Sequence, residues 1–227
     1  MQSRGGRKEG CVETFLLVLA ALFPVVNPPG SSLIFLSMTR GASPKIRHSL
    51  SRRVALNAFI IMIMSLLVGG LILKLYGISI PVLRVAGGLV VAATGWKLLN
   101  EGDPKTAGDE VASKGHKTDF MGLAFYPLTL PITTGPGTIA VMISLGLSRS
   151  AQQGDLQFFV AALAAAIVVA ATIYVCFAYS DWIARVFGTV GTDVLVRLTA
   201  FILFCLGLQI VWSGVSELFG VLQKAPV

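Results

Sequence analysis

Long apolar segments alternate with polar stretches along this chain. The apolar segments lie at about 12–38, 54–76, 82–99, 119–147, 156–180 and 194–219. Each is long enough for a helix that crosses a bilayer, which needs about 17–25 residues. The polar stretch 100–118 has mixed charge and no apolar period, so we expect a loop there. The pattern predicts an all-α polytopic membrane protein with six transmembrane helices in a single membrane domain, 1–227.

Prolines and glycines interrupt the first and fourth segments. The first contains FPVVNPPGSS at 23–32, and the fourth contains LPITTGPGT at 130–138. Proline removes a backbone N–H and clashes with the carbonyl one turn earlier, so neither segment can continue as a regular helix. We expect two half-helices joined by unwound backbone in each, which at membrane depth must be buried in protein or line a cavity. Kinks that serve only packing are the alternative.

The two halves of the chain resemble each other. Aligning Pro24 with Pro131 also matches three further pairs: Pro29 with Pro136, Gly30 with Gly137, and Ser31 with Thr138. We therefore expect repeat one at about 12–99 and repeat two at about 119–219. A unit of three helices begins and ends on opposite sides of a membrane, so its copy must run inverted, as in many secondary transporters.

The expected half-helices end near each other and offer partial charges of both signs. Free N–H groups are expected at Gly30–Ser32 and Gly137–Ile139, and free carbonyls around Val25–Val26 and Ile132–Thr133. The first would suit a carboxylate and the second an ammonium group, so the pattern favours a zwitterion such as a small neutral amino acid. The candidate substrate-binding residues are Asn27, Pro28, Gly30, Ser31, Thr133, Thr134, Gly135, Gly137 and Thr138.

Two arginines occupy matching places near the starts of the third and sixth segments. Arg84 and Arg197 could close a gate or contact a substrate carboxylate, and snorkelling to the lipid headgroups is the alternative. The remaining Lys and Arg residues are more numerous in the loops that follow the first, third and fifth segments. This distribution predicts that those loops are cytoplasmic and that both termini lie outside.

Composition excludes several classes of protein. Only 13% of the residues are charged and 55% are apolar, which excludes a soluble or disordered chain. The net charge of +7 sits in loops, so it gives no reason to expect nucleic-acid binding. The two histidines lie in charged stretches and every carboxylate lies in a loop or near a segment end. We expect no metal site, no cofactor and no enzymatic activity.

Three stretches resemble the MarC family of bacterial inner-membrane proteins, which is also grouped with neutral amino acid transporters. They are FPVVNPPGSS at 23–32, LRVAGGLVVAATGWKLL at 83–99 and FYPLTLPITTGPGTIAV at 125–141. The resemblance covers about 14–213 and implies six helices in two inverted repeats. It also implies an inner-membrane location and glycine- or alanine-like substrates for some members.

Together these features predict a secondary transporter of small neutral amino acids that works by alternating access, with one repeat rocking against the other. Its partners would be a small-molecule substrate and the lipid bilayer. An exporter of other small solutes, a non-transporting scaffold and an intramembrane enzyme are the alternatives. The direction of transport, a coupling ion (Na⁺ or H⁺) and a homo-oligomeric state stay open.

Overall fold

Every element that the structure describes is a helix. The computed structural model describes residues 3–39, 41–101, 120–149 and 155–224, so most of the predicted 100–118 loop lies outside it. The helices are α1 (Ser3–Val26), α2 (Pro28–Met38), α3 (Pro44–Tyr76), α4 (Ile80–Glu101), η1 (Gly122–Ala124), η2 (Phe125–Thr133), α6 (Pro136–Arg149), α7 (Asp155–Ala178) and α8 (Ser180–Lys224). Within these ranges, five spans are long and apolar enough to cross a membrane, and a bent pair of helices makes up to a sixth. The all-helical membrane fold is confirmed.

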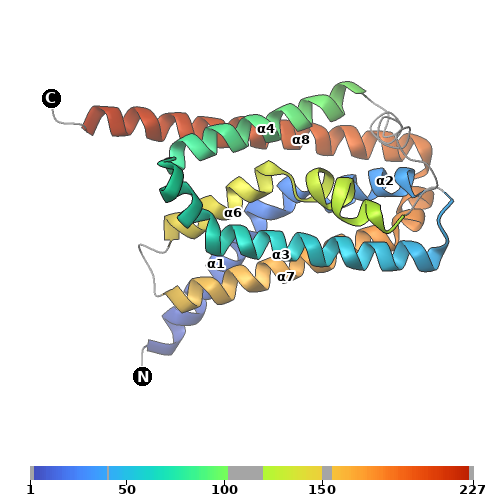
Figure 1. The fold of residues 1–227 in the computed structure, drawn as a ribbon, viewed down its shortest axis with the longest axis horizontal. Helices are drawn as coiled ribbons and strands as arrows, with labels where there is room; N and C mark the ends of the chain where they lie inside the picture. The colour runs from blue at the N-terminus through green and yellow to red at the C-terminus, as the bar shows by residue number, and fades with distance from the viewer. Residues whose placement is uncertain (1–2, 40, 102–119, 150–154, 225–227) are drawn as a thin grey trace.

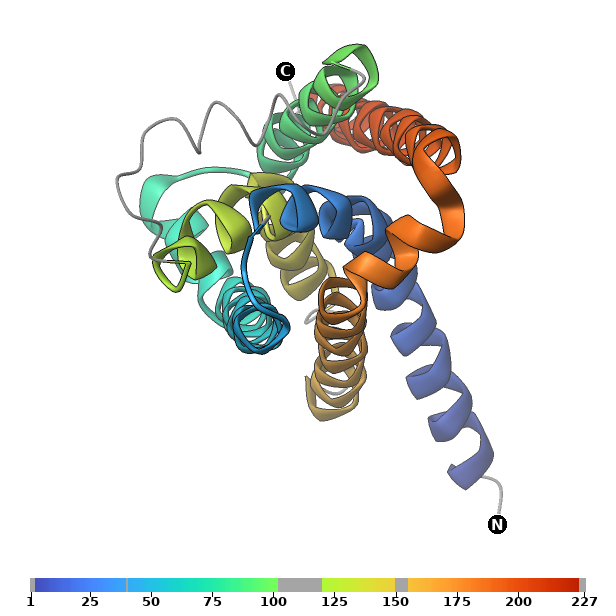
Figure 2. The same ribbon diagram turned by 90° about the vertical axis from the view of Figure 1, so that its right-hand side faces the viewer.

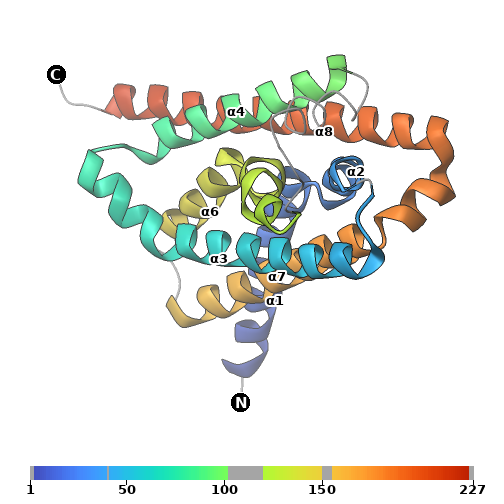
Figure 3. The ribbon, with the colours of Figure 1, turned by 45° about the vertical axis from the view of Figure 1, so that its right-hand side comes forward.

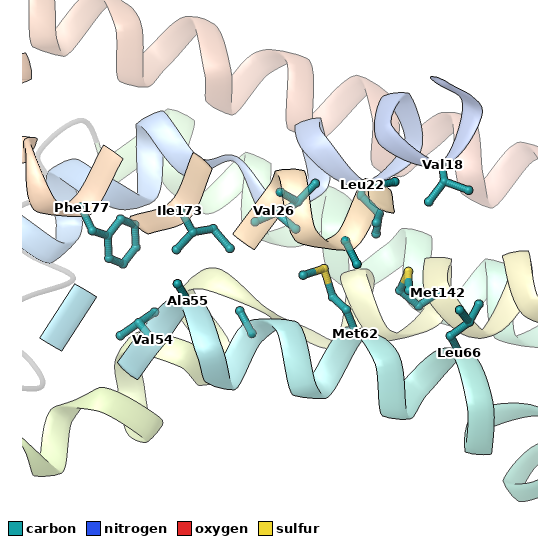
Figure 4. Close-up of a cluster of buried hydrophobic side chains, with 14 of the residues drawn as sticks. Val18, Leu22, Val26, Val54, Ala55, Met62, Leu66, Met142, Ile173 and Phe177 are labelled. Carbon is teal, nitrogen blue, oxygen red and sulfur yellow. The ribbon is translucent and has the colours of Figure 1, made fainter. Parts of the chain in front are cut away.

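The apolar core lies between α1, α3, α6 and α7. It contains Val18, Leu22 and Val26 of α1, Val54, Ala55, Met62 and Leu66 of α3, Met142 of α6, and Ile173 and Phe177 of α7 (Figure 4). Phe35 of α2 stacks on Phe177, with ring centroids 4.7 Å apart. Lipid tails are as apolar as these side chains, so close packing, rather than removal from water, holds this core together.

Helices α4 and α8 form a separate antiparallel pair that lies along one side of the core (Figure 3). Glycines allow their backbones to approach closely. A Cβ at Gly88 would lie 2.7 Å from the backbone nitrogen of Val211, and one at Gly214 would lie 2.7 Å from the carbonyl oxygen of Pro81. No side chain fits in those places, so the two helices are held together by backbone contact, as at small-residue interfaces in membranes.

Helix α3 begins earlier than the sequence pattern predicts. The stretch before residue 54 was expected to be a basic loop, but it is helical from Pro44. The Ser43 side chain accepts a hydrogen bond from the Ile46 N–H, and proline is favoured at the first helical position. The charge of Arg47 does not prevent a helix here, because its guanidinium has partners. It donates to the Thr39 carbonyl at 3.2 and 3.3 Å and pairs with Asp181.

Glycines set the ends and the bend of the long helices. Gly77 has φ +66° and ends α3, and the next N–H, of Ile78, bonds to the Leu73 carbonyl at 2.9 Å. Gly188 has φ 64° and ψ −175°, a conformation open essentially to glycine alone, so α8 changes direction there (Figure 2). The first two turns of α8 therefore form a corner that returns the chain from α7 to α4.

The described spans run back and forth between two ends of the molecule. In Figure 1, α3 begins and α7 ends at the right, whereas α3 ends, α7 begins and α8 ends at the left. The right-hand end carries Lys45, Arg47, Arg52 and Arg53 in the first turns of α3 and Arg185 in the corner of α8. We call it the basic end and the other the opposite end.

Candidate functional site

The first interruption is a single residue, Asn27, between α1 and α2. Asn27 has φ 48° and ψ 60°, the left-handed region that asparagine tolerates better than most residues. Its Oδ1 accepts a hydrogen bond from the Gly30 N–H at 3.2 Å, which caps α2. The amide lies so close over Gly30 that a Cβ there would clash with it. The left-handed backbone and the cap at residue 27 thus favour asparagine, and the asparagine amide leaves room only for a glycine at residue 30.

The second interruption is wider. The backbone of η2 departs from helical geometry at Tyr126 and Leu130, and η2 meets α6 with a bend of 66° across Thr134 and Gly135. Threonines satisfy the irregular backbone of η2. The Thr129 hydroxyl donates to the Ala124 carbonyl at 2.6 Å, and the Thr133 hydroxyl donates to the Leu128 carbonyl at 2.7 Å. These bonds give a partner to two carbonyls along the irregular stretch.

The helix ends are less open than the sequence analysis expects. The Ser31 N–H bonds to the Asn27 carbonyl at 2.9 Å, and the Ile139 N–H bonds to the Gly135 carbonyl at 3.3 Å. With the Gly30 N–H capped by Asn27, three of the groups predicted to be free are bonded within their own chain segment. For these three groups the prediction was wrong. α2 and α6 begin at Pro28 and Pro136, so the N–H groups of Ser31 and Ile139 already reach the carbonyls four residues earlier.

Ser31 connects the two interruptions. Its hydroxyl lies 3.2 Å from the Val26 carbonyl, at the end of α1, and 3.4 Å from the Ile132 carbonyl, near the end of η2. The serine is buried. Two proline motifs a hundred residues apart in the chain therefore meet, and both carbonyls predicted at the helix ends lie there.

A cavity of about 400 Å³ lies between the two interruptions and the α4–α8 pair. Seven of the nine predicted binding residues line it: Asn27, Gly30, Ser31, Thr133, Gly135, Gly137 and Thr138. Pro28 and Thr134 are buried but are not part of the lining. The volume falls within the range of ligand pockets, about 300–1,000 Å³.

The wall of the cavity that faces the two interruptions was not predicted from the sequence. It comes from α4 and α8, and its residues are Val90, Val91, Thr94, Lys97, Leu98, Val196, Thr199 and Leu203. The α4 members follow the spacing of one helix face. The spacing shows that these residues share a helix face, but it does not show what that face contacts. The sequence therefore gives only a weak indication that they line a cavity.

Towards the opposite end, α6 closes against α4. A Cβ at Gly137 would clash with the Val91 side chain, and a Cβ at Gly87 would clash with Ala140. Arg84 adds a polar contact to this seam: its Nε donates to the Ser144 hydroxyl of α6 at 2.8 Å. The cavity therefore lies on the basic-end side of a tightly packed α4–α6 seam.

The two arginines singled out in the sequence lie outside the cavity lining. Arg84 links three helices, because it also forms an ion pair with Glu217 of α8. Arg197 is an exposed residue of α8. Although Arg84 and Arg197 occupy equivalent positions in the two expected repeats, their surroundings differ. A gate or a carboxylate contact at either residue stays a prediction.

Charge is sparse around the cavity. Lys97, an exposed residue of α4, is the charged side chain among its lining residues. Within the described ranges, no group of three or more His, Cys, Asp or Glu residues is arranged to hold a metal ion. The site thus offers hydroxyls, an amide, backbone carbonyls and one cation.

Comparisons with known proteins agree with this architecture. The family model described as "MarC family integral membrane protein" matches residues 12–219. A UPF0056 membrane protein of Archaeoglobus fulgidus is 30% identical over 208 residues, which cover 92% of this chain and 95% of the relative. The UPF0056 inner membrane protein MarC of Salmonella paratyphi B is 34% identical, covering 89% of this chain and 94% of the relative.

The UPF0056 inner membrane protein MarC of Escherichia coli O1:K1 / APEC is 33% identical over 207 residues, which cover 89% of this chain and 94% of the relative. No solved structure matches. The family match covers both proline motifs and the α4 and α8 faces that line the cavity, so the relatives align with the whole site. This chain belongs to the MarC family of integral membrane proteins.

Proposed function

We propose that this protein is a secondary transporter that moves small neutral amino acids, such as glycine and alanine, across the inner membrane by alternating access. The observation that carries the proposal is the 400 Å³ cavity at the point where two interrupted helices meet. Interrupted helices around a midplane cavity are the usual construction of secondary-transporter sites.

The chemistry of the lining fits a neutral solute with polar groups. Ser31, Thr133 and Thr138 supply hydroxyls, and Asn27 supplies an amide. Carbonyl oxygens of Val26 and Ile132 lie beside Ser31 and suit an ammonium group. No carboxylate is among the described lining residues, so a cationic substrate has no counter-charge there.

Inverted repeats are part of the proposal, and the packing of the helices supports them. α1 and α2 pack on α7, as η2 and α6 pack on α3. Likewise α4 packs on α6, as α8 packs on α2. α4 and α8 pack antiparallel on each other, as two copies related by an axis in the membrane plane would.

The packing favours a different moving unit from the rocking of one repeat against the other that the sequence suggests. The α4–α8 pair takes one helix from each repeat, so moving repeat one against repeat two would break its backbone contacts at Gly88 and Gly214. It would also break the core shared by α1, α3, α6 and α7. A movement of the α4–α8 pair against that core keeps both intact and changes the contacts that the pair makes with α2 and α6 around the cavity. Arg84 would act as a gate, because its bond to Ser144 crosses the seam that must open.

The orientation rests on the distribution of basic residues. The basic end carries five Lys and Arg residues in the first turns of α3 and α8, so we place it in the cytoplasm, with both termini outside. In this orientation the seam between α4 and α6 lies on the outer side of the cavity, and we propose that this conformation faces inward.

Two alternatives fit less well. An intramembrane enzyme would need a base beside Ser31, but the hydrogen bonds of its hydroxyl go to backbone carbonyls. A scaffold would have the space between the interruptions filled with side chains, whereas the cavity occupies it. An exporter of other small neutral solutes would use the same geometry and differs only in substrate.

Uptake of radiolabelled glycine and alanine into proteoliposomes that contain the purified protein tests the proposal. Thr138→Val removes a buried lining hydroxyl without changing side-chain size, and we expect it to lower uptake at least tenfold. Thr172→Val is the matched control, because Thr172 lies on α7 outside the lining. Imposed Na⁺ and H⁺ gradients identify the coupling ion. Uptake no greater than in protein-free liposomes would refute amino acid transport.

A further inference from the structure

The cavity is much larger than glycine or alanine. A void of about 150 Å³ in an engineered protein accommodates benzene, which has six non-hydrogen atoms. The cavity here has about 400 Å³, whereas glycine has five non-hydrogen atoms. A bound glycine would leave more than half of the space to water.

The surplus space extends along α4 away from the helix interruptions. Val91 contacts α6 beside Gly137 and so marks the level of the interruptions. The lining continues along α4 to Leu98, seven residues further towards the basic end. Seven residues of α-helix span about 10 Å. The cavity is therefore elongated, with the hydroxyls, amide and carbonyls of the interruptions at one end.

The walls of the elongated part are largely aliphatic. Five aliphatic side chains from α2, α4 and α8 line this part: Ile34, Val90, Leu98, Val196 and Leu203. Thr94, Thr199 and the exposed Lys97 share it with them. Water held against such walls gains few hydrogen bonds, whereas an apolar group gains close packing. A solute with a polar head and an apolar tail matches this division of the lining better than a solute without a tail.

We propose that the preferred substrate is a neutral amino acid with a large apolar side chain, of the size of leucine, methionine or phenylalanine. This proposal rests on neutral amino acid transport as proposed above, and it replaces glycine and alanine by larger amino acids as the preferred substrates. The amino and carboxyl groups bind beside Asn27, Ser31 and Thr138, and the side chain lies in the cavity against the α4–α8 pair, along Val90 and Leu203.

The expected preference follows from the buried area. Each CH₂ group that moves from water into an apolar site favours binding by about fourfold. The leucine side chain adds four carbons to glycine, so at least a tenfold lower half-saturation concentration for leucine than for glycine is expected even if only half of that burial is realised.

The test compares uptake of leucine, methionine, phenylalanine, alanine and glycine by the full chain in proteoliposomes. Leu203→Trp is the informative variant, because Leu203 is buried and lines the cavity, so the added ring must occupy it. Ile202→Trp is the matched control, since Ile202 is the neighbouring residue and is 44% exposed on the outer face of α8. We expect Leu203→Trp to weaken leucine uptake at least tenfold while alanine uptake falls less than threefold, and Ile202→Trp to change neither.

The outcomes separate the two proposals. Glycine and alanine taken up as well as leucine, or better, would overturn the preference for large side chains and leave amino acid transport standing. Uptake of none of the five would overturn both. If Leu203→Trp does not fold, the order of the five substrates on the unsubstituted protein decides the question.

Discussion

The cap formed by Asn27 gives the sharpest test of the site geometry. Replacing Asn27 with alanine removes the acceptor of the 3.2 Å bond from the Gly30 N–H, and the loss of such a cap costs about 1 kcal/mol. Alanine must also adopt φ 48°, and a left-handed conformation costs an ordinary residue about 1–2 kcal/mol. The two effects together predict a loss of about 2–3 kcal/mol. Replacement with glycine removes the same bond but carries no left-handed cost, so only a few tenths of a kcal/mol are expected.

Thermal unfolding in a mild detergent measures the difference. For a chain of this length, about 1 kcal/mol corresponds to roughly 2–4 °C in Tm, so Asn27→Ala should lower the Tm by roughly 4–12 °C and Asn27→Gly by no more than about 2 °C. Equal Tm values for the two variants would show that the left-handed backbone at residue 27 imposes no constraint, and the account of the first interruption would be wrong.

Three further variants probe the helix contacts. Gly137→Ala should reduce transport at least tenfold, because the added Cβ clashes with the Val91 side chain. The double variant Gly137→Ala/Val91→Ala should regain transport. A double variant as inactive as the single one would contradict the steric explanation. Gly88→Val should destabilise the α4–α8 pair by about 1–3 kcal/mol in thermal unfolding, whereas Leu89→Val on the exposed face should change stability little. Arg47→Gln should cost about 1.5–3 kcal/mol, since it removes two bonds to a carbonyl and an ion pair at the basic end, and an unchanged Tm would assign that cluster no structural role.

The proline motifs could be found in the sequence because their effect is local. Pro28 and Pro136 each begin a helix, where proline is tolerated, and each disfavours continuation of the segment before it, so the interruptions at Asn27 and at Thr134–Gly135 fall inside the motifs that predict them. How open the helix ends are could not be predicted in the same way. That depends on whether the Asn27 side chain folds back to cap Gly30 and on where α2 and α6 begin, which the order of residues does not determine.

The far wall of the cavity depends on contacts between distant segments. Val90, Thr94 and Leu98 form one face of an apolar helix, and α4 has similar residues on its lipid-facing side. Only the packing of α4 on α8 decides which face points inward, and that packing is set by glycines whose partners lie about a hundred residues away. The start of α3 was missed for a related reason: the charge of Arg47 suggested a loop, but its partners are Thr39 and Asp181.

The pairing of α4 with α8 also has a consequence for biosynthesis. α4 ends at Glu101, and the segment of α8 that covers its glycine face, around Gly207, is translated about a hundred residues later. At roughly 5–20 residues per second, the ribosome leaves that face without its partner for about 5–20 s. A helix satisfies its own backbone in lipid, so α4 can wait in the bilayer while the other helices pack. The cavity wall is then completed only when α8 is inserted, so the cavity forms after the four core helices have been made.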